Sequence, residues 1–160
     1  MFAAKLAWSS LLTAVLLIAT AVTGWARHCS EATLKGTYGV VEQGTNVVGP
    51  PPPFPPAPFP TVLKANPTYD GAGNLSGTYT GSFGGIIVPG TFTGTYKVTA
   101  DCAYSDEVLV LPFNEVFHHT GFITGEGTLQ EIRYVYSDPG VVTAGTAKKL
   151  HGSANSTEER

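Results

Sequence analysis

The stretches Gly77-Thr-Tyr-Thr-Gly-Ser-Phe83 and Phe92-Thr-Gly-Thr-Tyr-Lys-Val98 decide the fold of this 160-residue chain. Alternate residues of a β-strand point to the same face of the sheet. In both stretches the glycines and large rings therefore share one face, while threonines occupy most of the other. Glycine beside a large ring lets a sheet coil sharply while the ring fills the enclosed space. The pattern favours a closed β-barrel with its rings inside, although repeated strand chemistry without any binding role would give the same pattern.

The rest of the chain also predicts strands separated by tight turns. Glycine, threonine, tyrosine and valine are frequent, and long runs of alanine, leucine, glutamate and lysine are absent, which favours strands over helices. Only residues 29–34 are expected to form a helical turn, with Ser30 as its N-cap. The expected strands are 35–42, 61–69, 75–83, 86–100, 107–113, 116–124, 131–137 and 141–150. Eight strands joined by short turns predict an all-β fold, a closed antiparallel up-and-down barrel, because closure removes both exposed edges. A β-sandwich is the alternative.

The first 26 residues are typical of a secretion signal. Lys5 supplies a positive start, and residues 11–22 form an apolar core that is shorter than the roughly 20 residues of a membrane span. Gly24-Trp25-Ala26 then places small residues at the cleavage positions. We expect cleavage after Ala26, a secreted or periplasmic protein, and no membrane span in the mature chain. An uncleaved signal anchor is the alternative.

The mature chain is expected to contain one β-barrel domain, residues 27–150, and a disordered polar tail, residues 151–160. Within the domain, residues 49–60 hold eight prolines in twelve positions. Proline cannot donate to a β ladder, so this segment is expected to be a polyproline II loop. It is compatible with an exposed spacer, a cover over one barrel mouth, or a ligand for aromatic grooves.

The net charge and the cysteine content limit the classes of function that are expected for this chain. Lys5 leaves with the signal, so the 9 basic residues become 8 against 12 acidic ones, a net charge of −4. No basic patch remains to bind nucleic acid. Cys29 and Cys102 predict one disulfide in an oxidising compartment, which would close a loop of about 74 residues and contribute about 4 kcal/mol. Two cysteines without CxxC spacing make a poor zinc site, so no metal is expected.

Several motifs of the mature chain resemble those of a group of secreted bacterial proteins of unassigned function. They are Cys29-Ser30, Leu34-Lys-Gly-Thr-Tyr38, Asp70-Gly-Ala-Gly-Asn-Leu-Ser-Gly77, Gly94-Thr-Tyr-Lys-Val-Thr-Ala-Asp-Cys102, Glu131-Ile-Arg133 and Asp138-Pro-Gly-Val-Val-Thr-Ala-Gly-Thr-Ala147. These are turn and strand motifs, so the resemblance implies a fold and no activity. The chain is more loosely similar to lipocalin-type barrels, with Tyr38 where those proteins carry tryptophan in a Gly-x-Trp, and to allene-oxide-cyclase barrels. No catalytic residue is transferred from either.

The adjacent residues His118 and His119 are the first candidates for a catalytic or ligand-orienting role. Neighbouring residues on a strand face opposite sides, so only one of the two can enter a barrel. An inward histidine can act as a general base or orient a ligand, although a hydrogen-bonded or solvated histidine without a function is the commoner case. Glu115 and Tyr134 are the other candidate catalytic groups.

The leading hypothesis is a non-enzymatic exported barrel that binds a small apolar ligand inside or a partner at its loops. It requires a cavity at least as large as a small lipid. The candidate ligand-binding residues are Tyr79, Phe92, Tyr96, Tyr134, Tyr136 and Arg133. We expect Arg133 to point outward, because Ile132, Tyr134 and Tyr136 alternate with it and are expected to form the face of the strand that packs in the core. A barrel enzyme of isomerase or cyclase type and a structural envelope component are the alternatives. No cofactor is expected.

Overall fold

The computed structural model describes residues 28–47 and 57–151. The predicted signal peptide, most of the proline-rich loop and nearly all of the predicted tail lie outside the described residues. The elements are η1 (Glu31–Leu34), β1 (Gly36–Asn46), β2 (Phe59–Tyr69), β3 (Asn74–Phe83), β4 (Ile86–Val98), β5 (Ala103–Leu111), β6 (Glu115–Thr124), η2 (Gly127–Leu129), β7 (Glu131–Tyr136) and β8 (Val141–Lys149).

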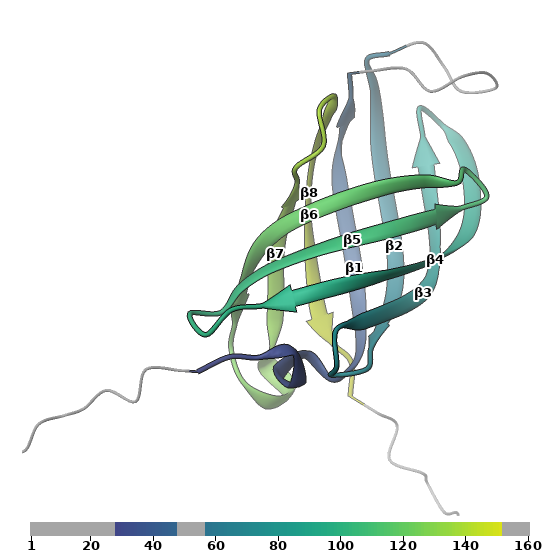
Figure 1. The fold of residues 1–160 in the computed structure, drawn as a ribbon. Helices are drawn as coiled ribbons and strands as arrows, with labels where there is room; N and C mark the ends of the chain where they lie inside the picture. The colour runs from purple at the N-terminus through teal and green to yellow at the C-terminus, as the bar shows by residue number, and fades with distance from the viewer. Residues whose placement is uncertain (1–27, 48–56, 152–160) are drawn as a thin grey trace, which may run out of the picture.

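The eight strands form one closed antiparallel barrel (Figure 1). Each strand pairs with its neighbours in sequence, and β8 pairs with β1 to close the ring. The predicted all-β barrel is therefore confirmed, and the β-sandwich alternative is wrong. None of the helices in the described ranges is long and apolar enough to cross a membrane.

The glycine and ring positions of the opening stretches pair across the strands. Gly77 lies opposite Phe92, and Tyr79 lies opposite Gly90. A Cβ atom on Gly90 would lie 2.4 Å from the ring of Tyr79. The rings therefore lie directly over glycines of the neighbouring strand; the sequence pattern predicted that glycines and rings share the inward face, but not this pairing between strands.

The fifth strand begins four residues earlier than predicted, at Ala103 instead of residue 107. The chain reverses tightly here, because Cys102 takes a positive φ of 69° and the Thr99 N–H donates to the Ala103 carbonyl at 3.0 Å. The strand therefore resumes directly after Cys102. This difference matters for the site, because it places Tyr104 and Asp106 on a strand with their side chains turned inward.

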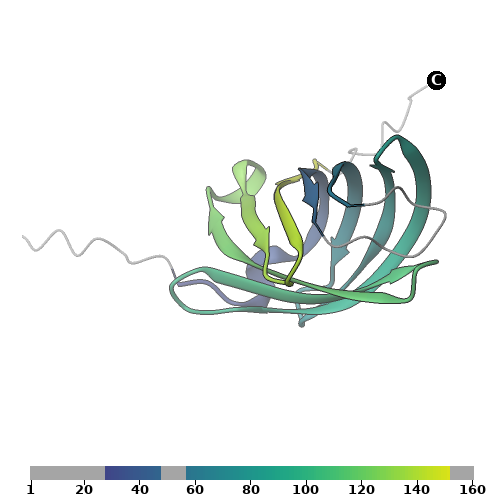
Figure 2. The same cartoon turned by 90° about the horizontal axis from the view of Figure 1, so that it is seen from above.

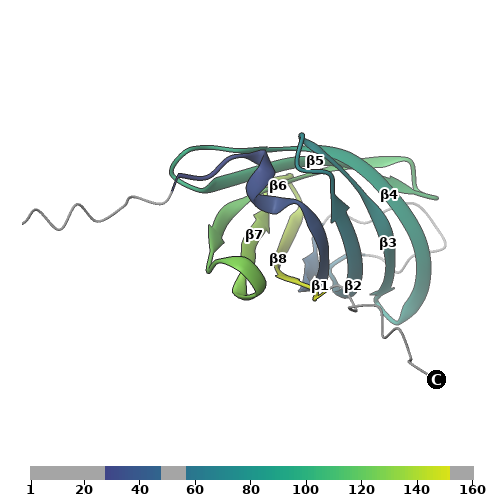
Figure 3. The same cartoon turned by 90° about the horizontal axis from the view of Figure 1, so that it is seen from below.

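One end of the barrel is closed by η1 and a cluster of tyrosines. Figures 1 and 3 show η1 lying at this end, and Leu34 of η1 is fully buried. The ring of Tyr69 makes edge contacts with Tyr38 at 5.2 Å and with Tyr96 at 5.0 Å between centroids. The Tyr38 hydroxyl donates to Gln130, which precedes β7. These side chains fill the closed end with a solid core.

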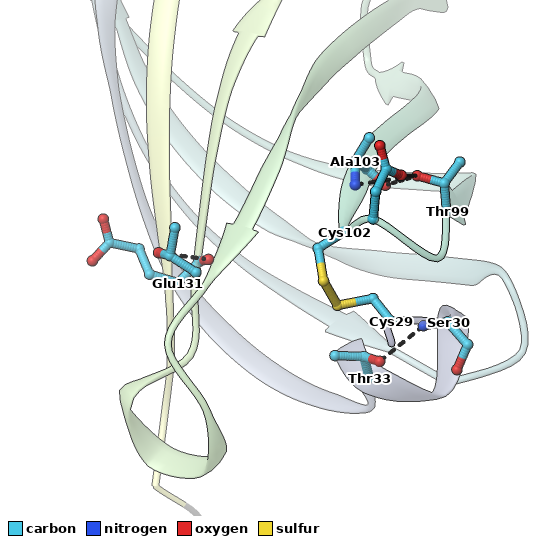
Figure 4. The surroundings of a disulfide bond; sticks show 9 residues. Cys29, Ser30, Thr33, Thr99, Cys102, Ala103 and Glu131 are labelled. Carbon is cyan, nitrogen blue, oxygen red and sulfur yellow. Dashed lines mark hydrogen bonds between the residues drawn. A yellow bond between two sulfur atoms is a disulfide. The ribbon is translucent and has the colours of Figure 1, made fainter. Parts of the chain in front are cut away.

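The predicted disulfide between Cys29 and Cys102 is present at the same end (Figure 4). It ties the segment before η1 to the β4–β5 turn, with the two Cα atoms 5.0 Å apart. The Ser30 N–H donates to Thr33 Oγ1 at 3.0 Å, which supports the helical turn beside the bond. The disulfide therefore fixes η1 against the closed end, and it is consistent with an oxidising extracellular or periplasmic environment.

At the opposite end, the wall between β6 and β7 is incomplete. The β6–β7 ladder stops at the pair His119 and Tyr136, and the Ser137 N–H adds one bond to the His118 carbonyl at 2.9 Å, so residues 115–117 lie beyond it while they still pair with β5. Figure 2 shows the β5–β6 hairpin running along one side while the other strands curve round in an arc. Several apolar side chains here are only partly buried: Leu63, Phe83, Val110, Phe113 and Phe117. This end is the mouth of the barrel.

Candidate functional site

A cavity of about 60 Å³ lies inside the barrel, between the closed end and the mouth. All strands from β1 to β7 contribute to its walls. The apolar and aromatic lining residues are Val40, Leu63, Ala65, Pro67, Tyr69, Leu75, Tyr79, Phe92, Tyr104, Val108, Val110, Phe117, Tyr134 and Tyr136. Three lining residues are ionisable in the ordinary pH range: Glu42, Asp106 and His119.

This cavity is smaller than the leading hypothesis required. An apolar cavity of about 150 Å³ is needed to enclose benzene, and a small lipid is larger still. The expected lipid-sized cavity is therefore wrong for this structure, because tyrosine and phenylalanine rings occupy most of the interior. The space accommodates a small polar head or a few waters, and a larger ligand would have to extend into the mouth.

His119 and Asp106 form a buried pair on adjacent strands. They lie opposite each other in the β5–β6 ladder, and His119 Nδ1 is 2.6 Å from Asp106 Oδ1. The side chain of His119 is 8% exposed and that of Asp106 is 6% exposed. Because a carboxylate only accepts hydrogen bonds, Nδ1 carries a proton and donates it to Asp106, and in the neutral imidazole this leaves Nε2 with a lone pair.

The carboxylate of Asp106 accepts two further hydrogen bonds, and one of their donors contacts a second tyrosine. Its Oδ1 also accepts from the His119 backbone N–H at 3.1 Å, and its Oδ2 accepts from the Tyr104 hydroxyl. The Tyr104 and Tyr69 hydroxyls are 3.1 Å apart. Burial is the main reason why the pKa values of both tyrosines are raised far above 10, so both stay protonated. The network orients Asp106 toward His119 and extends to the closed end.

Glu42 forms a second buried carboxylate at the cavity. It is 6% exposed, and it accepts hydrogen bonds from the Tyr134 hydroxyl at 2.6 Å and the Tyr136 hydroxyl at 2.7 Å. Burial and the neighbouring Glu42 charge hold the pKa values of both tyrosines well above their usual range. Both hydroxyls therefore remain donors and are committed to Glu42.

The imidazole of His119 connects the two clusters. Its ring makes edge contacts with Tyr136 at 4.2 Å and Tyr134 at 5.0 Å between centroids. Burial lowers the pKa of His119, but the hydrogen bond and charge of Asp106, together with the charge of Glu42, outweigh it and raise the pKa above 6.5. His119 Nε2 is buried and has no hydrogen-bond partner among the described residues. A buried polar atom left unpaired costs free energy, so it requires an explanation.

His118 points to the outside of the barrel, as the alternation of side chains requires. Its Nδ1 lies 2.8 Å from Asp138 Oδ1, its Nε2 lies 3.6 Å from Glu107 Oε2, and its side chain is 47% exposed. The hydrogen bond that His118 donates to the Asp138 carboxylate is the main reason why the pKa of His118 is raised above 6.5.

No group of three or more histidine, cysteine, aspartate or glutamate side chains in the described chain is arranged to hold a metal ion.

The structure brings some of the predicted site residues together and separates others. His119, Tyr79, Phe92, Tyr134 and Tyr136 line the cavity. Four other candidates do not line it: His118, Glu115, Tyr96 and Arg133.

The residues that do not line the cavity have other surroundings. Glu115 is exposed at the start of β6. The Tyr96 hydroxyl lies at the closed end, where it donates to the Glu31 carbonyl and accepts from the Gly71 N–H, both at 3.0 Å. Arg133 points outward as expected, with its side chain 63% exposed and its Nε 2.7 Å from Glu131 Oε1. Arg133 and Tyr96 are therefore no part of a ligand site inside the barrel.

The sequence analysis missed Glu42, Asp106 and Tyr104. Glu42 shares the strand face of the buried Tyr38 and Val40, so the two-residue alternation already indicated that it points inward. Asp106 and Tyr104 share the face of Val108 in the same way, but the predicted fifth strand began after them. A carboxylate at an inward strand position was the signal for both acids.

Comparisons with known proteins do not assign this chain to a family. No family model matches it, and no curated protein matches it. One similar solved structure is a redesigned beta barrel, b11L5F_LGL, with 15% identity, a TM-score of 0.45, and coverage of 79% of this chain and 98% of that one. Another is a redesigned beta barrel, mFAP1, bound to DFHBI, with 20% identity, a TM-score of 0.44, and coverage of 74% and 97%. The resemblance to secreted bacterial proteins stays a prediction.

Proposed function

We propose that this protein is an exported barrel that binds a small molecule through the mouth of the barrel. The ligand has an apolar body and one hydrogen-bond-donating group. The donor enters the cavity and reaches His119 Nε2, while the body packs on the partly exposed side chains of the mouth, such as Leu63, Val110 and Phe117.

The observation that carries the proposal is the buried Nε2 of His119. It lies on a residue that lines the cavity, it has no partner within the described chain, and Asp106 fixes its tautomer. A ligand donor would satisfy this atom and supply about 1 kcal/mol of binding free energy, typical of a neutral hydrogen bond. Small-molecule sites generally combine apolar walls with a few placed polar groups.

A barrel enzyme of isomerase type is the second candidate, and the Asp106–His119 pair is the observation that favours it. A carboxylate that accepts from Nδ1 makes Nε2 a better general base. Such an enzyme also needs donors or cations where negative charge develops on the substrate. The Tyr134 and Tyr136 hydroxyls are committed to Glu42, and none of the described lining residues is lysine or arginine. Binding is therefore the better supported function.

Calorimetric titration with 1-hexanol tests the proposal. His119→Asn keeps a donor for Asp106 but removes Nε2, and it should weaken hexanol binding about fivefold, since about 1 kcal/mol corresponds to that ratio. His118→Asn is the matched control on the outer wall and should leave the affinity unchanged. Equal affinities for the wild type and both variants would show that hexanol binds without Nε2 and would contradict the proposal.

A further inference from the structure

We propose that the donor group this cavity selects is a small ammonium, so that the ligand is an amine with an apolar body. This inference rests on the proposed small-molecule function and specifies the chemistry of the polar group. The observations that support it are the charges, the acceptor atoms and the rings around His119.

The charge of the cavity is negative. Glu42 on β1 and Asp106 on β5 both line it and are both buried. None of the described residues that line the cavity is lysine or arginine to balance them. Two buried carboxylates without a paired cation attract a positive charge, and they repel an anionic ligand.

The hydrogen-bonding capacity that is left free around His119 is that of acceptors, because the Tyr134 and Tyr136 hydroxyls already donate to Glu42. In the neutral imidazole of His119, Nδ1 donates to Asp106 and Nε2 is an acceptor. The Glu42 oxygens accept from Tyr134 and Tyr136 with further lone pairs remaining. A carboxylate ligand brings only acceptors, whereas an ammonium brings three donors and no acceptor. The unpaired Nε2 is therefore matched by an ammonium and left unsatisfied by an anion.

Aromatic rings surround these acceptors. Tyr79, Phe92, Phe117 and Tyr136 all line the same cavity. A cation over an aromatic face gains roughly 0.5–2 kcal/mol, depending on how far it is desolvated. Rings, carboxylates and one neutral imidazole together form the surroundings that ammonium groups prefer in proteins.

Protonation of His119 competes with the ammonium. Asp106 from β5, Glu42 from β1, and Tyr134 and Tyr136 from β7 face its ring, and Asp138 after β7 adds a negative charge. These charges raise the pKa of His119, so the imidazolium supplies the missing cation at low pH. Amine affinity should therefore increase as the pH rises through the titration of His119.

The test uses three ligands of one chain length on the oxidised protein: n-hexylamine, 1-hexanol and hexanoate. We expect hexylamine to bind at least tenfold more tightly than hexanol at pH 8, and hexanoate to bind more weakly than either. Hexylamine affinity should also fall between pH 8 and pH 6, which needs no variant. Glu42→Gln should remove the hexylamine advantage and change hexanol affinity less than twofold. Glu107→Gln removes the same charge from the outer wall, where that side chain is 64% exposed, and should preserve the advantage.

The outcomes separate the two proposals. If hexanol binds in a His119-dependent way but hexylamine binds no better, the ammonium inference is wrong and the small-molecule function stands. If hexylamine is favoured equally in the wild type and in Glu42→Gln, the buried carboxylate is not the cause and the inference is overturned. If none of the three ligands binds, both proposals fail.

Discussion

Replacing Gly145 with alanine tests the packing of rings over glycines that closes this barrel. Gly145 on β8 lies opposite Tyr134 on β7. A Cβ atom there would lie 2.4 Å from Tyr134 Cζ, 2.5 Å from the hydroxyl oxygen and 2.6 Å from Cε2. The ring has little freedom to move, because it is 8% exposed and its hydroxyl donates to Glu42 at 2.6 Å.

The expected cost follows from these contacts. Overpacking a well-filled interior costs about 1–3 kcal/mol. Displacing the ring also breaks its hydrogen bond to the Glu42 carboxylate, which is worth about 1.5–3 kcal/mol. Alanine regains about 0.5–1 kcal/mol, because glycine loses more conformational entropy in a strand. Gly145→Ala should therefore lower the free energy of unfolding by about 2–5 kcal/mol.

The assay is urea unfolding of a double-mutant cycle, followed by circular dichroism. Tyr134→Leu removes the three atoms that lie nearest to the new methyl group. In that background Gly145→Ala should be neutral or should stabilise by up to about 1 kcal/mol. If the substitution is equally destabilising in both backgrounds, the ring of Tyr134 is not the reason for glycine at this position. A neutral effect in the wild-type background would refute the packing argument altogether.

Three further predictions concern the disulfide and the buried histidine. Replacing Cys29 and Cys102 together with alanine should lower the free energy of unfolding by about 4 kcal/mol, measured with urea, because the bond closes a loop of about 74 residues; an unchanged urea midpoint would contradict this. The raised folded-state pKa of His119 stabilises the fold fully below about pH 6.5, the unfolded value, and this stabilisation is lost as the pH rises through the folded pKa. The urea midpoint should therefore fall as the pH rises from about 6.5 through the folded-state pKa of His119, and it should fall less in His119→Asn. An equal pH dependence of the midpoint in the wild type and in the variant would contradict this prediction. Asp106→Asn removes the main charge that raises the pKa of His119, so an NMR titration should show that pKa falling below 6.5, where burial then dominates; no change would show that Asp106 does not control it.

The barrel could be predicted from the sequence because its signals are local. Glycine and ring alternation in residues 77–83 and 92–98 fixed which face turns inward, and the turn residues set the strand order. The same alternation predicted that Arg133 points outward and that His118 and His119 lie on opposite faces of their strand. The disulfide needed only the count of two cysteines in a chain whose first 26 residues predict an export signal.

The site could be predicted only in part because its residues are distant in sequence. Glu42 meets Tyr134 and Tyr136 only after β1 and β7 are both in the closed barrel, where β8 separates them. Asp106 was missed because the fifth strand was expected to begin at residue 107, whereas it begins at Ala103, directly after Cys102. The cavity volume depends on how the rings pack, and no strand pattern specifies that. Tyr96 shows this limit of the sequence pattern, because it lies in the same Gly-Thr-Tyr motif as Tyr79 but is placed in the closed end and not at the cavity.

Nitrogen-15 NMR of the His118 and His119 side chains tests the central claim, that His119 Nε2 is the polar anchor of a small-molecule site. In the free protein above the pKa of His119, we expect the Nδ1–H tautomer with an unprotonated Nε2. Titration with n-hexylamine or 1-hexanol should move the Nε2 resonance of His119. The dissociation constant from this movement should equal the one from calorimetry, while the resonances of His118 stay in place. A His119 resonance that does not move when either ligand binds, or one that moves together with that of His118, would contradict the claim.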